Sequence, residues 1–358
     1  MLDNQHFWMR AETRPDEQRA PITPEDAARL IGAGHRVSVE ACRNRVLHDD
    51  RYRAAGCQIV QAGSWLHAPL NAWILGLKEL PDQTGPLRHR HIYFAHAIKG
   101  QTGAADLLQC FADGGGALFD LEYMADAQGR RIAAFGYWAG YVGASLGLLA
   151  WNGDLGSLAA MTQSVLRARL SSMDLVRRPR TLVIGANGRC GQGARDALAD
   201  AGLTPTAWDI AETRALDRAD LLDHDMLVNA VGMTGPADPF VTPACIAEPK
   251  RRLTMIVDVT CDVYGPAHCL PVYDSLTSWT RPVRHLNTPA DTPLSVIAID
   301  NLPSLLPAES SADFSVQLTP HLMTAGRSTP WHSAQKAFET AAVAAAIQPH
   351  MQKELTHA

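Results

Sequence analysis

The sequence predicts an α/β protein with largely parallel sheets and enough length for two domains. Short apolar strand patterns alternate with helical patterns along the chain, which is typical of helices that cover the faces of a parallel sheet. A glycine-rich turn joins a strand to a helix near the middle of the chain, a common feature of such sheets. The chain has 358 residues, which suits two domains of ordinary size.

The first part of the chain contains an early helix and several strands. Thr23 is a suitable N-cap with Pro24 at the first helical position, and glycines end this helix before an alternating strand at residues 35–41. We expect two further strands, one that ends at Lys78 and one that ends at His96.

The clearest segment is a strand, a glycine-rich turn, a helix and a second strand that ends at Asp209. Its glycines have the spacing GxxGxxG at Gly185, Gly188 and Gly191, which is weaker than GxGxxG as a pattern. The flanking strand and helix, with an acid about twenty residues later, strengthen it. Backbone amides at such a helix start can face a pyrophosphate, and a carboxylate at Asp209 would favour NAD over NADP. The alternative is a glycine-rich turn that binds nothing.

Two later strands end in small or polar residues. In an open α/β sheet, ligands lie at the carboxyl ends of strands, where Asn229, Thr260 and Asp262 are expected. A further strand leads into Asp300, and a last helix covers residues 333–355.

Composition and charge exclude several classes of protein. The formal net charge is −5 and basic residues form no cluster, which argues against a nucleic-acid partner. The seven cysteines are scattered without a zinc spacing, so we expect no metal site and a reduced, cytoplasmic protein. The first residues lack the pattern of a signal peptide.

Residues 132–151 form a run without charge that begins after two arginines. Its length is that of a transmembrane helix, and small residues on one helical face also occur in membrane helices. The alternative is a buried helix that packs closely between domains. That interpretation is favoured because the run is isolated, rich in glycine and only moderately apolar.

Eight segments, in order, resemble the NAD-dependent, lysine-forming saccharopine dehydrogenase family, within the wider group that includes alanine dehydrogenase. They are RAETRPDEQRAPITP, AGSWLHAP, GLKELP, IYFAHAIKGQ, DLEYMADAQGRRIAAFGYWAG, VIGANGRCGQGA, IVDVTCD and LSVIAIDNLPSLLP. The resemblance implies two Rossmann-like domains with parallel twisted sheets and an active-site cleft between them. It places a catalytic domain at residues 1–134 with 320–358, and an NAD-binding domain at 135–319, entered by a helix around 136–151.

The resemblance also implies a reaction and its residues. Saccharopine, NAD and water would give L-lysine, 2-oxoglutarate and NADH, with Lys78 as the base and His96 as the acid/base, both at the ends of adjacent strands. The substrate is expected to contact Arg19, Lys99, Gln101, Arg131, Phe135, Thr260, Cys261 and Asp262. The cofactor is expected to contact Arg130, Gly188, Arg189, Asp209, Thr213, Gly232, Val259, Ile299, Asp300, Asn301 and Leu302. We expect small-molecule partners, no membrane and a monomer.

Three positions depart from the family pattern. Gly232 stands where relatives carry an aromatic residue, Asn301 replaces a histidine, and Cys261 replaces an alanine. Each could change the affinity for cofactor or substrate. An alanine-dehydrogenase-like or other opine oxidoreductase therefore remains an alternative, because it would share Lys78 and His96. A non-catalytic dinucleotide sensor is disfavoured, since it would have lost one of that pair.

Overall fold

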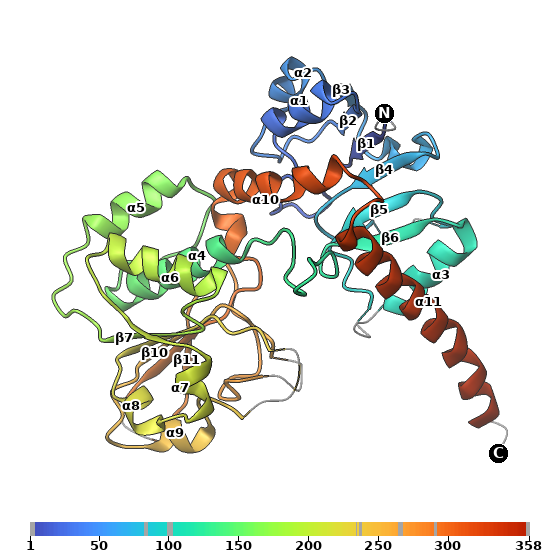
Figure 1. The fold of residues 1–358 in the computed structure, drawn as a ribbon. Helices are drawn as coiled ribbons and strands as arrows, with labels where there is room; N and C mark the ends of the chain where they lie inside the picture. The colour runs from blue at the N-terminus through green and yellow to red at the C-terminus, as the bar shows by residue number, and fades with distance from the viewer. Residues whose placement is uncertain are drawn as a thin grey trace. The chain divides into compact units, whose positions relative to one another are not determined.

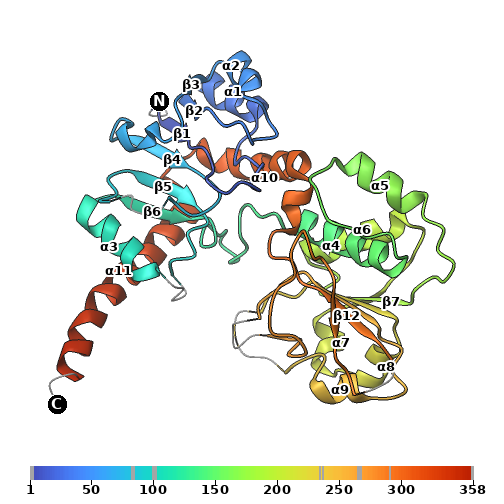
Figure 2. The same ribbon diagram turned by 180° about the vertical axis from the view of Figure 1, so that it is seen from behind.

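The structure is a computed structural model that divides into two units (Figures 1 and 2). It describes residues 4–81, 85–98, 103–233, 235, 238–263, 268–289 and 292–355, with side chains described as far as residue 345. Unit 1 comprises Met1–Ala134 with Ser310–Ala358, and unit 2 comprises Phe135–Glu309.

The second boundary differs from the one expected after residue 319. It lies after Glu309, within helix α10 (Pro307–Leu322). Ser311 accepts a 2.9 Å hydrogen bond from the amide of Ala20. These contacts continue along the helix, where Ser315 accepts one of 2.9 Å from the amide of Thr23. Most of α10 therefore belongs with the first unit.

Unit 1 is built on a six-stranded sheet in which neighbouring strands are parallel, in the order β3-β2-β1-β4-β5-β6. The strands are β1 (His6–Met9), β2 (Arg36–Glu40), β3 (Gln58–Val60), β4 (Ala72–Leu75), β5 (Arg90–Tyr93) and β6 (Ala117–Asp120). This is a doubly wound strand order. All six strands therefore end at the same edge of the sheet.

Besides α10, unit 1 has five further helices within the described residues. They are α1 (Pro24–Gly32), α2 (Asp49–Ala54), η1 (Ser64–His67), α3 (Ala104–Gly114) and α11 (Thr329–Leu355). The expected cap of α1 is confirmed, because the Thr23 hydroxyl oxygen accepts a hydrogen bond from the amide of Asp26. The start of α11 packs against α3 and β6 (Figure 1).

Unit 2 also has a six-stranded sheet, in the order β11-β12-β10-β9-β7-β8. The strands are β7 (Thr181–Ile184), β8 (Thr206–Trp208), β9 (Met226–Asn229), β10 (Met255–Asp258), β11 (Arg284–Leu286) and β12 (Leu294–Ile297). The edge strand β11 is antiparallel to β12 and was not expected from the sequence. The other pairs are parallel, so the expected α/β fold with two largely parallel sheets is confirmed.

Helices cover both faces of the second sheet. They are α4 (Gly136–Trp151), α5 (Gln163–Ser171), α6 (Arg189–Asp200), α7 (Ile210–Arg214), α8 (Arg218–Leu222), α9 (Pro243–Ala247) and η2 (Leu302–Leu305). Successive strand residues point to opposite faces. Val183 and Val228 accordingly join a core with α4, α5 and α6, whereas Leu182 and Leu227 join a second core with α8 and α9.

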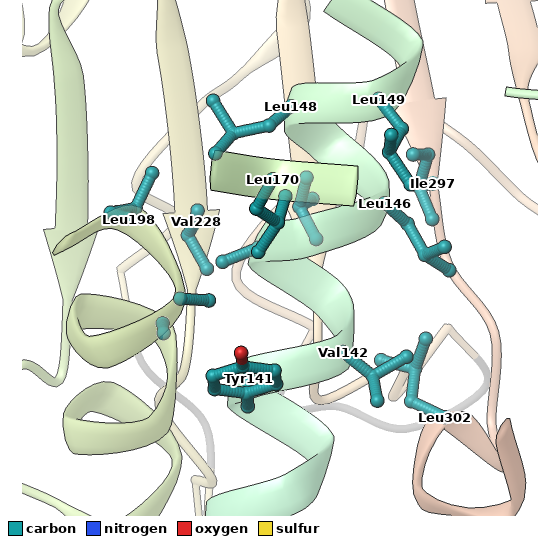
Figure 3. Packing of buried hydrophobic residues seen from close by; sticks show 14 of the residues in the cluster. Tyr141, Val142, Leu146, Leu148, Leu149, Leu170, Leu198, Val228, Ile297 and Leu302 are labelled. Atoms are coloured by element: carbon teal, nitrogen blue, oxygen red, sulfur yellow. The ribbon is translucent and has the colours of Figure 1, made fainter. Parts of the chain in front are cut away.

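The uncharged run forms α4, in the core of unit 2. A Cβ on Gly140 would lie 1.7 Å from the carbonyl oxygen of Cys190, and the small residue lets α4 approach α6 closely. Figure 3 shows Val142 of α4 beside Leu302. The expectation that this segment packs between domains is therefore wrong, because its apolar side chains fill the core of one unit. No helix within the described ranges combines the length and apolar character needed to span a membrane.

Candidate active site

Lys78 and His96 follow neighbouring strands of unit 1. Lys78 comes after β4 and His96 after β5, and these two strands pair in parallel. Both strands end earlier than the sequence suggested, at Leu75 and Tyr93. The amide of Lys78 donates a 3.0 Å hydrogen bond to Glu12 instead of continuing a strand ladder. The half-buried Lys78 and the exposed His96 therefore stand on loops at the carboxyl edge of the sheet.

His96 has an unusual backbone conformation. Among the described residues other than glycine, positive φ angles occur at His96 (51°) and Cys261 (56°). Left-handed backbone is uncommon for such residues and clusters at functional sites, where the surrounding structure holds it. Both residues belong to the set that the sequence placed in the active site. The backbone is thus an independent indication of function at these two positions.

Carboxylates surround Lys78. Burial favours the neutral form of Glu17, but hydrogen bonds and charge from Arg19, with a contribution from the Lys78 charge, hold its pKa below the usual value. Burial has the same effect on Glu79, and Arg14 together with Lys78 again lowers the pKa. Both carboxylates are therefore ionised at neutral pH. They favour a positive charge on Lys78.

Arg19 is buried and forms a two-pronged ion pair. Its Nε and Nη2 atoms donate to the two carboxylate oxygens of Glu17 at 2.8 and 2.6 Å. Such a fork is the geometry that binds a carboxylate most specifically. Arg19 also lines a small cavity with Arg10, Glu12 and Arg45. The expected substrate arginine is therefore held in a fixed position by an internal acid.

Two further arginines lie near the end of the first segment of unit 1, which finishes at Ala134. Arg131 pairs with Glu122 at 3.1 Å, and Arg130 pairs with Asp126 at 3.0 Å. Both arginine side chains remain exposed. The expected ligands Lys99 and Gln101 lie outside the described residues.

Asp120 is a buried acid at the end of β6, next to the His96 segment. Burial raises the pKa of Asp120 to about 6, with a contribution from the Glu122 charge, although the amides of Glu122, Ala95 and His96 favour its ionised form. Its Oδ1 accepts a 2.9 Å hydrogen bond from the Glu122 amide. Oδ2 accepts none from the part of the chain that the structure describes. A group that titrates near neutrality therefore lies beside the proposed acid/base.

The glycine-rich turn of unit 2 fits a dinucleotide. Gly185 follows β7 with φ of +80°, and Gly188 is the N-cap of α6. A Cβ on Gly191 would lie 2.1 Å from the carbonyl oxygen of Gly185, so only glycine allows this close turn. The exposed Gly188 and Arg189 leave the first amides of α6 facing outward, where a pyrophosphate can bind.

Asp209 follows β8 beside this turn. One carboxylate oxygen accepts a 2.8 Å hydrogen bond from the amide of Asn187, within the turn, and the other accepts from the amide of Ile210. Glu212 completes a capping box, and the Thr213 hydroxyl donates to the carbonyl of Asp209 at 2.9 Å. The carboxylate is only partly exposed, in the position that binds ribose hydroxyls in dinucleotide folds.

The loop after β10 carries Val259, Thr260, Cys261 and Asp262. Asp258 organises it, because its Oδ1 accepts hydrogen bonds from the amides of Thr260 at 3.1 Å and Cys261 at 3.3 Å. Burial, together with the charges of Asp258 and Asp300, raises the pKa of the Cys261 thiol, so the group stays protonated. Its Sγ donates to the carbonyl oxygen of Asp258 at 2.9 Å.

The remaining expected cofactor residues also follow strands of unit 2. Ile299, Asp300, Asn301 and Leu302 come after β12, and Gly232 comes after β9. Trp279 donates from its indole nitrogen to Oδ1 of Asn301 at 3.1 Å, which fixes the amide that departs from the family pattern. A Cβ on Gly232 would meet nothing within 4 Å, so the missing aromatic leaves open space. The half-buried Phe135 is the N-cap of α4.

The structure thus gathers the described candidates at the carboxyl edges of two sheets. Unit 1 carries Lys78, His96, Arg19, Arg130 and Arg131, whereas unit 2 carries Phe135 and the dinucleotide set. Sequence reasoning missed the buried acids that support these residues, namely Glu12, Glu17, Asp120 and Asp258. The available signal was an acid within three residues of a strand end or of another candidate.

Known proteins resemble this chain over almost its whole length. A family model for the alanine dehydrogenase/PNT N-terminal domain matches residues 8–142. The saccharopine dehydrogenase (NAD+, L-lysine-forming) of Candida glabrata is 38% identical, over 92% of this chain and 95% of that protein. The protein of the same name from Schizosaccharomyces pombe is 38% identical, over 94% and 98%.

Structural comparison agrees at the level of the fold. An L-alanine dehydrogenase matches with a TM-score of 0.68 and 16% identity, covering 94% of each chain. At that identity the likeness shows a shared architecture. The sequence matches, at 38% identity over more than nine-tenths of the chain, show the family as well as the fold. The chain belongs to the family of NAD-dependent, L-lysine-forming saccharopine dehydrogenases.

Proposed function

We propose that this protein oxidises saccharopine with NAD and water to L-lysine and 2-oxoglutarate. The observation that carries the proposal is membership of the family at 38% identity over 92% of the chain. The lysine and histidine that the reaction requires also follow neighbouring strands of one sheet.

The reaction converts a secondary amine into an imine and then hydrolyses it. The amine nitrogen loses a proton, and the adjacent carbon loses a hydride. Water adds to the imine carbon, and the carbon–nitrogen bond breaks to release the primary amine of L-lysine and the ketone of 2-oxoglutarate. The chemistry that bound NAD supplies is acceptance of that hydride.

Lys78 is proposed to take the amine proton. It must be neutral when the substrate binds, and it becomes an ammonium when the proton arrives. Glu17 and Glu79 are close enough for the Lys78 charge to lower their pKa values. The same two carboxylates stabilise the ammonium that the proton transfer creates. The surroundings of Lys78 therefore stabilise the ammonium that the proposed step forms, and they disfavour the neutral amine that precedes it.

His96 is proposed to act on water. Its imidazole would accept a proton from the attacking water and return it to the departing nitrogen. The exposed side chain is accessible to water, and its left-handed backbone fixes the direction in which it leaves the loop.

The two expected substrate arginines are proposed to bind saccharopine carboxylates by different means. Arg19 is paired with Glu17, so its guanidinium has a fixed orientation. Arg131 pairs with Glu122 while its side chain stays 46% exposed, so a substrate carboxylate can compete for it. Arg130 and the dinucleotide set of unit 2 would hold NAD.

A spectrophotometric assay of NADH formation tests the proposal. Purified protein is incubated with NAD or NADP and with saccharopine, with alanine, or with one of a panel of other opines, which are secondary amines like saccharopine. We expect NADH from saccharopine with NAD, and L-lysine and 2-oxoglutarate as equimolar products. Turnover of alanine, or of an opine other than saccharopine, without turnover of saccharopine would overturn the substrate assignment and support the related oxidoreductase activity.

A further inference from the structure

An ion pair is buried directly after β1. Arg10 Nη1 lies 3.4 Å from Glu12 Oε2, and the two side chains are only 1% and 4% exposed. Removing two charges from water is costly, and such pairs are often no more stabilising than apolar residues of similar size. Burial of this pair therefore suggests a role other than stability.

The pair binds the backbone of the segment that carries Lys78. The amides of Leu77 and Lys78 donate hydrogen bonds to the two oxygens of Glu12, at 2.7 and 3.0 Å. Arg10 Nη2 donates to the carbonyl oxygen of Lys78 and, at 3.3 Å, to that of Glu79. The N–H and the C=O groups of Lys78 are thus both held by one buried pair.

The strand β4 and the glycine that follows it leave room for this ion pair. β1 and β4 pair in parallel with Met9 opposite Leu75, so the segments that follow them begin side by side. A Cβ on Gly76 would lie 2.4 Å from Nε of Arg10. A side chain at this position would therefore collide with the guanidinium where it now lies. The same guanidinium stacks over the ring of Tyr93, with 5.6 Å between Arg10 Cζ and the ring centre.

We propose that Glu12, together with Arg10, is a positioning residue for Lys78. Its carboxylate fixes two consecutive backbone amides, which sets the position from which the Lys78 side chain departs. Loss of this contact would let the amine drift from the substrate nitrogen, and a misplacement of about 1 Å can cost roughly 100-fold in rate. The inference rests on the proposed role of Lys78 as a base.

A double-mutant cycle separates positioning from stability. Glu12→Gln replaces one acceptor oxygen by an amide group that cannot accept, so one backbone bond is lost. We expect kcat for saccharopine oxidation to fall roughly 10- to 100-fold, while the KM for saccharopine and the KM for NAD each change less than about threefold. In the Lys78→Met background the same change should have almost no effect on kcat, because Glu12 acts through Lys78.

Asp225→Asn is the matched control. Asp225 is also a fully buried carboxylate that binds a backbone amide, that of Arg180 at 2.8 Å, and arginine side chains, but it lies in unit 2. We expect this variant to lower the melting temperature and to leave kcat unchanged in both backgrounds. If Glu12→Gln does not fold, Glu12→Asp is used, since it keeps the charge but cannot span both amides.

The outcomes are distinct. A fall in kcat confined to the wild-type background supports the inference. An equal fall in both backgrounds, or none in either, overturns it while leaving the proposed function intact. Wild-type activity of Lys78→Met itself would refute the role of Lys78, and with it both the base assignment and the positioning role.

Discussion

The Tyr273 hydroxyl donates a 2.6 Å hydrogen bond to Oδ2 of Asp258 at the carboxyl end of β10. Asp258 and Tyr273 are only 2% and 5% exposed. The other oxygen of Asp258 accepts from Nδ2 of Asn229 at 3.0 Å and from the amides of Thr260 and Cys261. One buried carboxylate therefore ties two strand ends to the loop that holds Cys261 in its left-handed conformation.

Asp258→Asn should weaken NAD binding. Asparagine keeps one acceptor oxygen, but its NH2 group donates and cannot accept. Whichever side of the former carboxylate this group takes, at least one buried donor is left unsatisfied, which costs about 1–3 kcal/mol. We expect the Kd for NAD to rise roughly tenfold as the loop loosens, since about 1.4 kcal/mol corresponds to that factor. Titration calorimetry with NAD measures this Kd. Tyr273→Phe is the milder control, because it leaves both loop amides bound, and an unchanged Kd in Asp258→Asn would contradict the role.

Lys78→Met and His96→Gln should each slow saccharopine oxidation by roughly 10²- to 10⁴-fold, the usual range for loss of a general acid or base. Lys78→Met should also remove the limb of the kcat/KM pH profile that reports ionisation of the base. Steady-state rates across a range of pH values test both. Arg88→Met provides a control, because Arg88 is an exposed cation that lines a surface hollow with Trp65 and His89. Wild-type rates in either active-site variant would refute the assigned role.

The sequence was sufficient to predict the class of the fold and the start of α1. The alternation of strands and helices and the cap at Thr23 are decided by residues that are close in sequence, so the sequence displays them directly. The end of β4 could not be predicted in the same way. It depends on Glu12, which is remote in sequence and accepts hydrogen bonds from the amides of Leu77 and Lys78.

The residues of the candidate site also differ in whether the sequence could predict them. Gly188 and Asp209 could be predicted as cofactor residues because a glycine-rich turn with a following acid has a binding mechanism that the sequence displays. Asp120 and Asp258 were missed, since their importance comes from burial and from partners that only the fold brings near. The segment against which α4 packs was wrongly predicted for a related reason. Small residues signal close packing, but they do not name the partner, which is α6.

Asp209→Asn should reduce the preference for NAD over NADP. The carboxylate repels a 2′-phosphate, and like charges in contact cost several kcal/mol, so we expect the ratio of kcat/KM values to fall at least about tenfold. Rates with both cofactors measure this ratio. Asp217→Asn is the matched control, because Asp217 also caps a helix of unit 2, accepting from the amides of Ala219 and Asp220. A ratio that changes equally in both variants would attribute the effect to helix capping.

Asp120→Asn should stabilise the protein at neutral pH but not in acid. Burial raises the pKa of Asp120 from its ordinary 3.8 to about 6, so the folded state prefers the protonated form. That preference supports folding fully below pH 3.8 and is lost as the pH rises through 6. At pH above 7 the ionised carboxylate costs up to about 3 kcal/mol, at 1.36 kcal/mol for each pKa unit.

Asparagine stays neutral at every pH and avoids that cost. Urea unfolding of Asp120→Asn and wild type should therefore give free energies that differ by up to about 3 kcal/mol near pH 7.5 and converge near pH 4. Asp225→Asn should show the opposite trend, because the Arg180 amide and the side chains of Arg177 and Arg252 outweigh burial and lower the pKa of Asp225. Its stability loss should be largest at neutral pH and shrink in acid. Parallel curves for Asp120→Asn and wild type would show that Asp120 has an ordinary pKa.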